Sequence, residues 1–303
     1  MRRGDFAASW AVNDQVLHGR DKAERDDPAQ PYHLRWVWDG RPFDGRRVLV
    51  RCYHGLGDTI QFCRYLPLLR RRVAHLSLEV QPPLLDLLAP LPGPDQLIPF
   101  RPGRPSASAD CDLEIMELAH ALRSLPDPVP YLRAAPLPRL EAAVLAGLCW
   151  HVDTGWDPGR SVPLPLLRAL EDVPGVRLVS LQRGAGADHA GQPGAPAMLQ
   201  EASMDLLHTA RRIASLDLVV TVDTMVAHLA GALGRPVWVL LQHEADWRWM
   251  AGRSTPWYGS ARLYRQPAPG DWHTPVRQVV ADLAALVQEK AGAGGTALAG
   301  RGL

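Results

Sequence analysis

The stretch DLVVTVDTMVAHLAGALGRPVWVLL, residues 217–241, sets the fold expected for this 303-residue chain. It predicts a buried strand at 217–222, a polar turn at Asp223-Thr224, a helix from Thr224 to Leu233 and a strand at 236–241. Apolar runs of this kind favour strands covered on both faces, as in a parallel sheet. The stretch therefore predicts a βαβ unit whose ligand-binding edge lies at the turn.

Strands and helices alternate on both sides of this stretch. Near it we expect strands at 143–150 and 176–182 and helices at 164–171, 204–215 and 274–289. A second series has expected strands at 46–52, 76–81, 96–100 and 111–116 and expected helices at 58–72 and 82–88. Prolines 126, 128, 130, 136 and 138 separate the two series, and proline stiffens a linker. The pattern predicts an α/β protein of two Rossmann-like domains, 46–135 and 140–272, that face each other across a cleft.

The two ends of the sequence differ from these domains. Residues 1–45 form an N-terminal extension with one expected helix, Phe6 to Leu17, and an expected loop at 21–31. Residues 273–290 are expected to form a C-terminal helix. The low-complexity tail 291–303, AGAGGTALAGRGL, is expected to be disordered.

Composition excludes several classes of protein. Hydrophobic residues make up 47% and charged residues 21%, and the formal net charge of +1 gives no electrostatic reason to expect nucleic acid as a partner. No apolar run approaches the ~18–20 residues of a membrane span, and no signal peptide is recognised. The four cysteines form no CxxC pair, so we expect reduced, buried thiols and no metal site. We also expect no cofactor. Without a recognised signal peptide or membrane span, we expect a cytoplasmic protein.

The first candidate site is the motif YHGLGD, residues 53–58, after the strand at 46–52. Gly55 and Gly57 are expected to permit a tight turn and leave space for a ligand. Asp58 is expected at the helix N-cap, where aspartate is a preferred capping residue, so a purely structural role is one open interpretation. The missing third glycine argues against a dinucleotide-binding fingerprint.

The second candidate site is the Asp223-Thr224 turn, followed one helical turn later by His228. Backbone N–H groups and the helix dipole favour a phosphate there, with Thr224 as an added donor. The alternative is that Asp223 and Thr224 are caps and His228 is a packed core residue. Gln182 and Arg183 end another strand and are expected at the same edge, where Arg183 either balances a pyrophosphate or lies on the surface. Tryptophans 247, 249, 257 and 272 suit either stacking on a ligand or a core.

Several segments, in this order and spacing, resemble the family 9 glycosyltransferases, the bacterial heptosyltransferases. They are HGLGDTIQFCRYLPLL (54–69), LEVQPPLLDLL (78–88), VLAGLCW (144–150), LVSLQ (178–182), residues 216–241 and DWRWM (246–250). The resemblance covers roughly residues 32–280. This part of the chain is also similar to the catalytic region often found behind tetratricopeptide repeats in bacterial proteins. GDFAASW (4–10) resembles the remnant of a last repeat helix.

The resemblance implies a GT-B fold and inverting, metal-independent transfer from a nucleotide-diphosphate sugar to a glycan or protein hydroxyl. The family's Gly-Asp pair matches Gly57-Asp58, which makes Asp58 the expected general base, with His54, Gly55, Gly57 and Thr59 as the acceptor-side loop. Asp223, Thr224 and His228 match the family's donor pyrophosphate site, and Gln182 and Arg183 are expected as further donor-binding residues from their place at a strand end. Met225 replaces a small residue, and the segment HVDTGWDPG (151–159) lacks a phosphate-binding lysine, a role that Arg160 or Arg183 takes in this hypothesis.

Three other functions stay open on the sequence. One is a degenerate transferase that binds a sugar nucleotide or glycan without turnover. A dinucleotide oxidoreductase is disfavoured by the missing glycine, and a scaffold would lack convergent polar groups in its pocket.

Overall fold

The computed structural model describes residues 4–102, 107–153, 157–200 and 205–299. The chain divides into two compact units, Met1–Arg133 (unit 1) and Ala134–Leu303 (unit 2). Each unit contains one sheet, and all the strands of each sheet run parallel. The α/β class with two parallel sheets is therefore confirmed, whereas the expected cleft between the domains stays a prediction.

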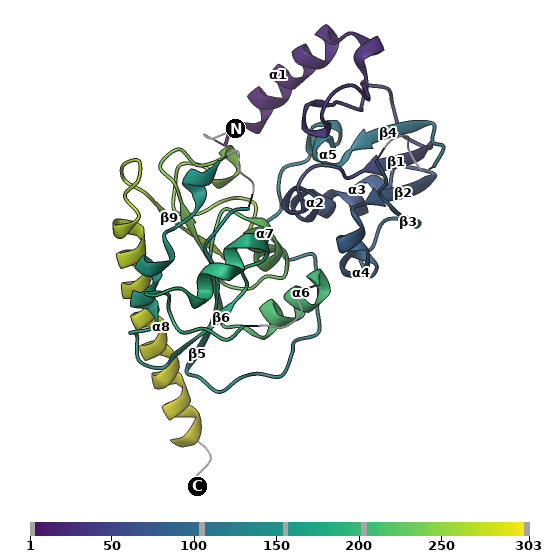
Figure 1. Cartoon of the computed structure of the whole chain (residues 1–303). Coiled ribbons are helices and arrows are strands. Elements are labelled where there is room, and N and C mark those ends of the chain that lie inside the picture. The colour runs from purple at the N-terminus through teal and green to yellow at the C-terminus, as the bar shows by residue number, and fades with distance from the viewer. Residues whose placement is uncertain (1–3, 103–106, 154–156, 201–204, 300–303) are drawn as a thin grey trace. The chain divides into compact units, whose positions relative to one another are not determined.

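Unit 1 is built on a four-stranded sheet of order β3-β2-β1-β4 (Figure 1). Its strands are β1 (Arg47–Arg51), β2 (His75–Val80), β3 (Gln96–Pro99) and β4 (Cys111–Glu114). Its helices are α1 (Phe6–Gly19), α2 (Leu56–Phe62), α3 (Leu66–Arg70), α4 (Leu85–Leu88) and α5 (Leu118–Ala121). Short 3₁₀ helices lie at Lys22–Glu24, Tyr32–Leu34, Cys63–Tyr65, Pro82–Leu84 and Ile115–Glu117.

Unit 2 has a five-stranded sheet of order β6-β5-β7-β8-β9 (Figure 1). Its strands are β5 (Val144–Cys149), β6 (Val176–Ser180), β7 (Leu218–Val222), β8 (Val237–Leu241) and β9 (Ala261–Arg265). Its α-helices are α6 (Leu206–Ser215), α7 (Met225–Ala232) and α8 (His273–Ala299). Its 3₁₀ helices lie at Pro158–Arg160, Leu164–Leu170, Gly184–Gly191 and Trp247–Trp249.

The helix expected at 58–72 differs most from the structure. It begins earlier, at Leu56, and it is divided by the 3₁₀ turn Cys63–Tyr65. Pro67 explains the division, because proline has no N–H to donate and its ring crowds the carbonyl four residues earlier. The helix expected at 164–171 is likewise a 3₁₀ helix, with Pro165 in its first turn.

Two further expectations need correction. Strand β9 was not predicted; only two of its residues, Leu263 and Tyr264, are buried and the others are partly exposed, as suits a strand at the edge of a sheet. The tail expected to be disordered continues α8 as far as Ala299, and residues 300–303 lie outside the described residues. Its alanines favour helix and no proline stops it, although each of its glycines costs roughly 1 kcal/mol relative to alanine.

The N-terminal extension is part of unit 1 rather than a separate body. The partly buried Glu117 carboxylate accepts hydrogen bonds from the backbone N–H groups of Val37 and Trp38, at 3.0 and 2.9 Å. Arg51, buried in β1, pairs with Asp26 of the extension and with Glu79 of β2. These contacts hold residues 26–38 to the sheet.

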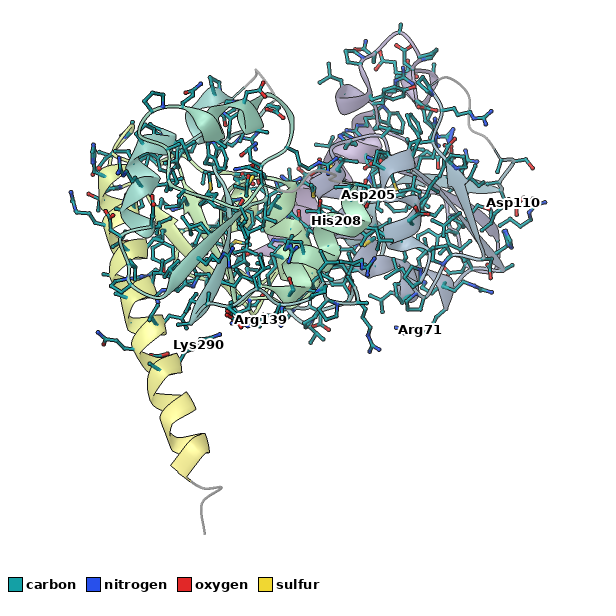
Figure 2. The ribbon with its side chains drawn as sticks, turned by 60° about the horizontal axis from the view of Figure 1, so that its bottom comes forward. Arg71, Asp110, Arg139, Asp205, His208 and Lys290 are labelled. Atoms are coloured by element: carbon teal, nitrogen blue, oxygen red, sulfur yellow. The ribbon has the colours of Figure 1, made fainter. Side chains whose placement is uncertain are left out.

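An ion-pair cluster lies at the end of unit 2 where its parallel strands begin. The Asp217 carboxylate accepts hydrogen bonds from both Arg139 Nη atoms, at 2.9 and 2.7 Å, and from the Leu145 N–H at 2.8 Å. Lys290 of α8 also binds this carboxylate, and Figure 2 shows Arg139 and Lys290 at the same end of the unit. Along α8, Val276, Val279 and Leu283 are buried in the core that covers β5.

Candidate active site

The strand orders locate one switch point in each sheet. In unit 1 the chain passes from β1 outward to β2 and β3 and then returns to β4 on the other side of β1. In unit 2, β6 and β7 lie on opposite sides of β5. Ligands of open α/β sheets bind beyond the carboxyl ends of the strands at such points, here β1/β4 and β5/β7.

Asp58 lies in the first turn of α2, directly after β1. The sequence predicted Asp58 as the N-cap of this helix, but the N-cap is Gly55. Asp58 occupies the third helical position. Asp58 Oδ2 accepts a hydrogen bond from the Gly55 N–H at 3.0 Å. A Cβ atom at position 55 would lie 3.0 Å from the same oxygen, so glycine leaves room for this carboxylate.

The other acceptor-side residues divide into two groups. His54 and Gly55 precede α2, whereas Gly57 and Thr59 are inside the helix and do not form a loop. Gly55 has φ −67°, which any residue adopts, so the expected need for a glycine turn is wrong. Thr59 is fully buried and its hydroxyl donates to Gln81 Oε1 at 2.9 Å, so it is a structural residue of this edge.

Two residues that the sequence reasoning missed complete the β1/β4 edge. Gln81, after β2, donates through Nε2 to the His54 carbonyl at 2.9 Å and so links this loop to the sheet. Glu114 ends β4, is 2% exposed and lies with Oε2 3.9 Å from His54 Nε2. An ionisable residue that ends a buried strand was the signal available in CDLE (111–114).

At the β5/β7 edge, Thr224 is the N-cap of α7. Its hydroxyl accepts from the Val226 N–H at 3.2 Å and lies 3.7 Å from Cys149 Sγ at the end of β5. Asp223 is 8% exposed, and Arg160 Nη1 donates to its carbonyl at 3.2 Å and lies 3.7 Å from its carboxylate. Burial raises the pKa of the Asp223 carboxyl, and the charge of Arg160 opposes this rise. Asp223, Thr224 and Arg160 therefore lie close together, and their role as donor contacts stays a prediction.

Gln182 has a structural role in the protein as described. Its Oε1 accepts the N–H groups of Trp150 and His151, at 3.0 and 2.9 Å. Its Nε2 donates to the carbonyls of His151 and Arg183, at 3.1 and 3.0 Å. Both polar atoms of this amide thus hold the segment after β5 in place. Gln182 was expected to contact the donor, but its side chain is engaged in these internal hydrogen bonds.

The remaining donor-side residues lie in different surroundings. Arg183 is partly buried, and its Nη1 lies 3.4 Å from the Thr209 hydroxyl. His228 is 5% exposed, its Nδ1 is 2.9 Å from the Tyr258 hydroxyl, and its ring stacks on Trp249 with centroids 5.3 Å apart. His228 therefore matches the packed-core alternative, and the buried Trp249 belongs to that packing. Trp257 is also buried and contacts Trp247 edge to face.

The described residues contain no group of three or more His, Cys, Asp and Glu side chains arranged to hold a metal ion. No helix within them combines the length and apolar character needed to cross a bilayer.

Residues 196–251 match the family model described as Glycosyltransferase family 9 (heptosyltransferase). This segment contains β7, the Asp223-Thr224 turn, α7 and β8. The chain is also 24% identical over 284 residues to Protein FlbA of Caulobacter vibrioides, an alignment that covers 81% of this chain. It spans about half of that relative, 48% of its length.

The fold is similar to solved glycosyltransferases. A family 9 glycosyltransferase from Veillonella parvula aligns with a TM-score of 0.58 at 14% identity, over 82% of this chain and 99% of that one. ADP-heptose LPS heptosyltransferase II from E. coli aligns with a TM-score of 0.55 at 16% identity, over 81% and 99% of the two chains. This likeness supports the α/β architecture with two parallel sheets, and the family match shows that residues 196–251 of unit 2 are similar to family 9 glycosyltransferases.

Proposed function

We propose that this chain is a glycosyltransferase that moves a sugar from a nucleotide-diphosphate sugar to a hydroxyl group of a glycan or protein. The observation that carries the proposal is that the family 9 match covers the Asp223-Thr224 turn, which lies at the β5/β7 switch point. Helix α7 begins at this turn. The free backbone N–H groups and the dipole at a helix N-terminus favour the binding of a phosphate group. ADP-heptose is the first donor to test, because the E. coli neighbour is named for it.

The transfer that we propose is inverting and independent of metal. Asp58 accepts the proton of the acceptor hydroxyl, whose oxygen attacks the anomeric carbon as the bond to the diphosphate oxygen breaks. The nucleoside diphosphate leaves with that electron pair toward the first turn of α7, where fixed dipoles stabilise its charge. The four cysteines are all free thiols, which fits the cytoplasm that we propose as the compartment.

One observation favours the alternative, a protein that binds the nucleotide sugar without turnover. Arg160, the cation expected to meet the diphosphate, already pairs with the carboxylates of Asp157 and Asp223, at 3.5 and 3.7 Å. The diphosphate of a donor must then compete with these two carboxylates for the guanidinium group of Arg160. The same binding without product formation would identify this alternative.

A panel of nucleotide sugars tests the proposal. Purified full-length chain is incubated with ADP-, GDP-, UDP- and dTDP-sugars, and the shift of its melting temperature is recorded for each. The donor that stabilises the chain is then mixed with hydroxyl acceptors, and release of nucleoside diphosphate is followed together with product mass. We expect one nucleotide class to stabilise the chain and to be consumed. No stabilisation by any of these donors would count against the proposal.

A further inference from the structure

Glu114 is a buried acid for which the proposed transfer has no role. Its side chain ends β4 at the switch point of unit 1 and is 2% exposed. One oxygen, Oε2, accepts the Met116 N–H at 2.7 Å, and the other, Oε1, is buried without a hydrogen-bond partner among the described residues. A buried carboxylate is costly unless a positive charge or a proton compensates it.

The group that faces this carboxyl is the imidazole of His54. His54 Nε2 lies 3.9 Å from Glu114 Oε2, within the range of an ion pair. The imidazole also stacks on Tyr53, with ring centroids 5.2 Å apart and an interplanar angle of 28°. Its side chain stays 17% exposed, so a carboxyl and an aromatic ring hold it while part of it reaches solvent.

The other charges around this pair favour one bound proton for the carboxyl and the imidazole together, so that when His54 carries it Glu114 is ionised. Burial raises the pKa of the Glu114 carboxyl well above its usual range, the Met116 N–H opposes this, and the acidic neighbours Glu117 and Asp58 raise it further. Burial raises the pKa of the Cys52 thiol and of the Tyr53 hydroxyl, and the charge of Glu114 raises both further. The nearby cation Arg51 is paired with Asp26 and Glu79. The pair His54–Glu114 thus lies in a region of excess negative charge.

We propose that Glu114 is a positioning residue that holds His54, as an imidazolium, beside Asp58 on the acceptor side of the site. A carboxylate that orients an imidazole fixes both its ring position and its protonation. His54 then presents a fixed, charged hydrogen-bond donor to the acceptor. This role for His54 rests on the proposed function, whereas the coupling of its charge to Glu114 does not.

Titration of His54 by NMR tests the coupling directly, in the full chain and without donor or acceptor. We expect the midpoint of the His54 imidazole signals to fall by at least about one pH unit in Glu114→Gln, a tenfold loss of proton affinity. Glu117→Gln is the control: it removes a partly buried acid of the 3₁₀ turn that Glu114 caps, whose oxygens bind the Glu114, Val37 and Trp38 N–H groups. It should move the midpoint much less. Equal midpoints in wild type and Glu114→Gln would overturn the proposal.

A second variant covers the case in which Glu114→Gln does not fold. In His54→Gln the buried carboxyl has no counter-ion and must keep its proton, so folding becomes less favourable as pH rises above the carboxyl's unfolded value. The stability gap between wild type and His54→Gln should therefore widen from pH 5 to pH 7. A constant gap would contradict the pairing.

Kinetics test the role in transfer separately. Glu114→Gln should lower kcat/KM for the acceptor about tenfold or more while the KM for the donor is unchanged. An unchanged acceptor kcat/KM would overturn the positioning role. If no transfer activity is found at all, the NMR result still decides whether His54 and Glu114 are coupled.

Discussion

The Asp58 carboxylate binds the backbone nitrogen of Gly55, with 3.0 Å between Asp58 Oδ2 and that nitrogen, and so caps the helix in which it lies. This contact needs an acceptor oxygen at position 58 but no negative charge. Transfer of a proton from a hydroxyl group does need a base. The cap and the proposed catalytic role can therefore be separated by one substitution that keeps the oxygen.

The donor site can be tested at Thr224. In Thr224→Trp the bulk at the start of α7 should abolish binding of the nucleoside diphosphate measured by calorimetry. The variant also loses the cap to the Val226 N–H, which costs about 0.5–2 kcal/mol of stability, so a folded protein is still expected. Thr224→Ser keeps the capping hydroxyl and should bind normally. Unchanged affinity in Thr224→Trp would place the donor elsewhere.

The structural role of Gln182 predicts a loss of stability. Gln182→Leu removes the acceptor for the Trp150 and His151 N–H groups, and each buried donor left unpaired costs about 1–3 kcal/mol. Unfolding by urea should show a destabilised unit 2. Wild-type stability would mean that the segment after β5 does not depend on this amide.

Asp217 gives unit 2 an acid-sensitive contribution to stability. Burial opposes its ionisation, but hydrogen bonds from Arg139, the Leu145 N–H and Lys290 outweigh it and lower its pKa from 3.8 to about 2. Because the folded value is the lower one, the stabilisation is complete above pH ~4 and is lost as pH falls through about 2. Asp217→Asn should cost roughly 1–2 kcal/mol at pH 7.

Urea unfolding at several pH values checks this prediction. The difference between wild type and Asp217→Asn should shrink between pH 4 and pH 2. Asp172→Asn changes an exposed acid of the same unit and should leave stability nearly unchanged. A difference that is constant with pH would contradict the role of the carboxylate charge.

Metal independence predicts the response to a chelator. In the proposed mechanism the leaving diphosphate is stabilised by α7 and not by a cation, so turnover should change by less than about twofold in excess EDTA. Turnover before and after dialysis against EDTA measures this. Strict dependence on added Mg²⁺ or Mn²⁺ would defeat this part of the mechanism.

Much of the sheet architecture was predictable because its information is local. The strands β5, β7 and β8 are apolar almost throughout, and β1 has an apolar centre, which pattern alone identifies. Strand β2 alternates leucine and valine with polar residues, which also indicates a strand. The half-exposed edge strand β9 has a weaker pattern and was missed. The break in the helix after Phe62 depends on one residue, Pro67, within an otherwise helical pattern.

The candidate site was predicted less completely, because side-chain partners depend on strand order. The order β3-β2-β1-β4 brings Glu114 next to the segment of His54, although they are far apart in sequence. The sequence also could not show that Gln182 uses its amide internally or that His228 stacks on Trp249. Asp223 and Thr224 were found because a strand, a cap and a helix lie consecutively in the chain, whereas Arg160, 63 residues from Asp223, was expected only from the family resemblance.

Turnover of Asp58→Asn tests the central claim most directly. Asparagine keeps an oxygen for the Gly55 N–H, so the melting temperature and the donor affinity should stay close to wild type. Loss of the base should lower kcat by at least about 10²-fold. Turnover close to wild type, or a loss of activity that only follows a loss of stability, would contradict the assignment of Asp58 as the base of a glycosyl transfer.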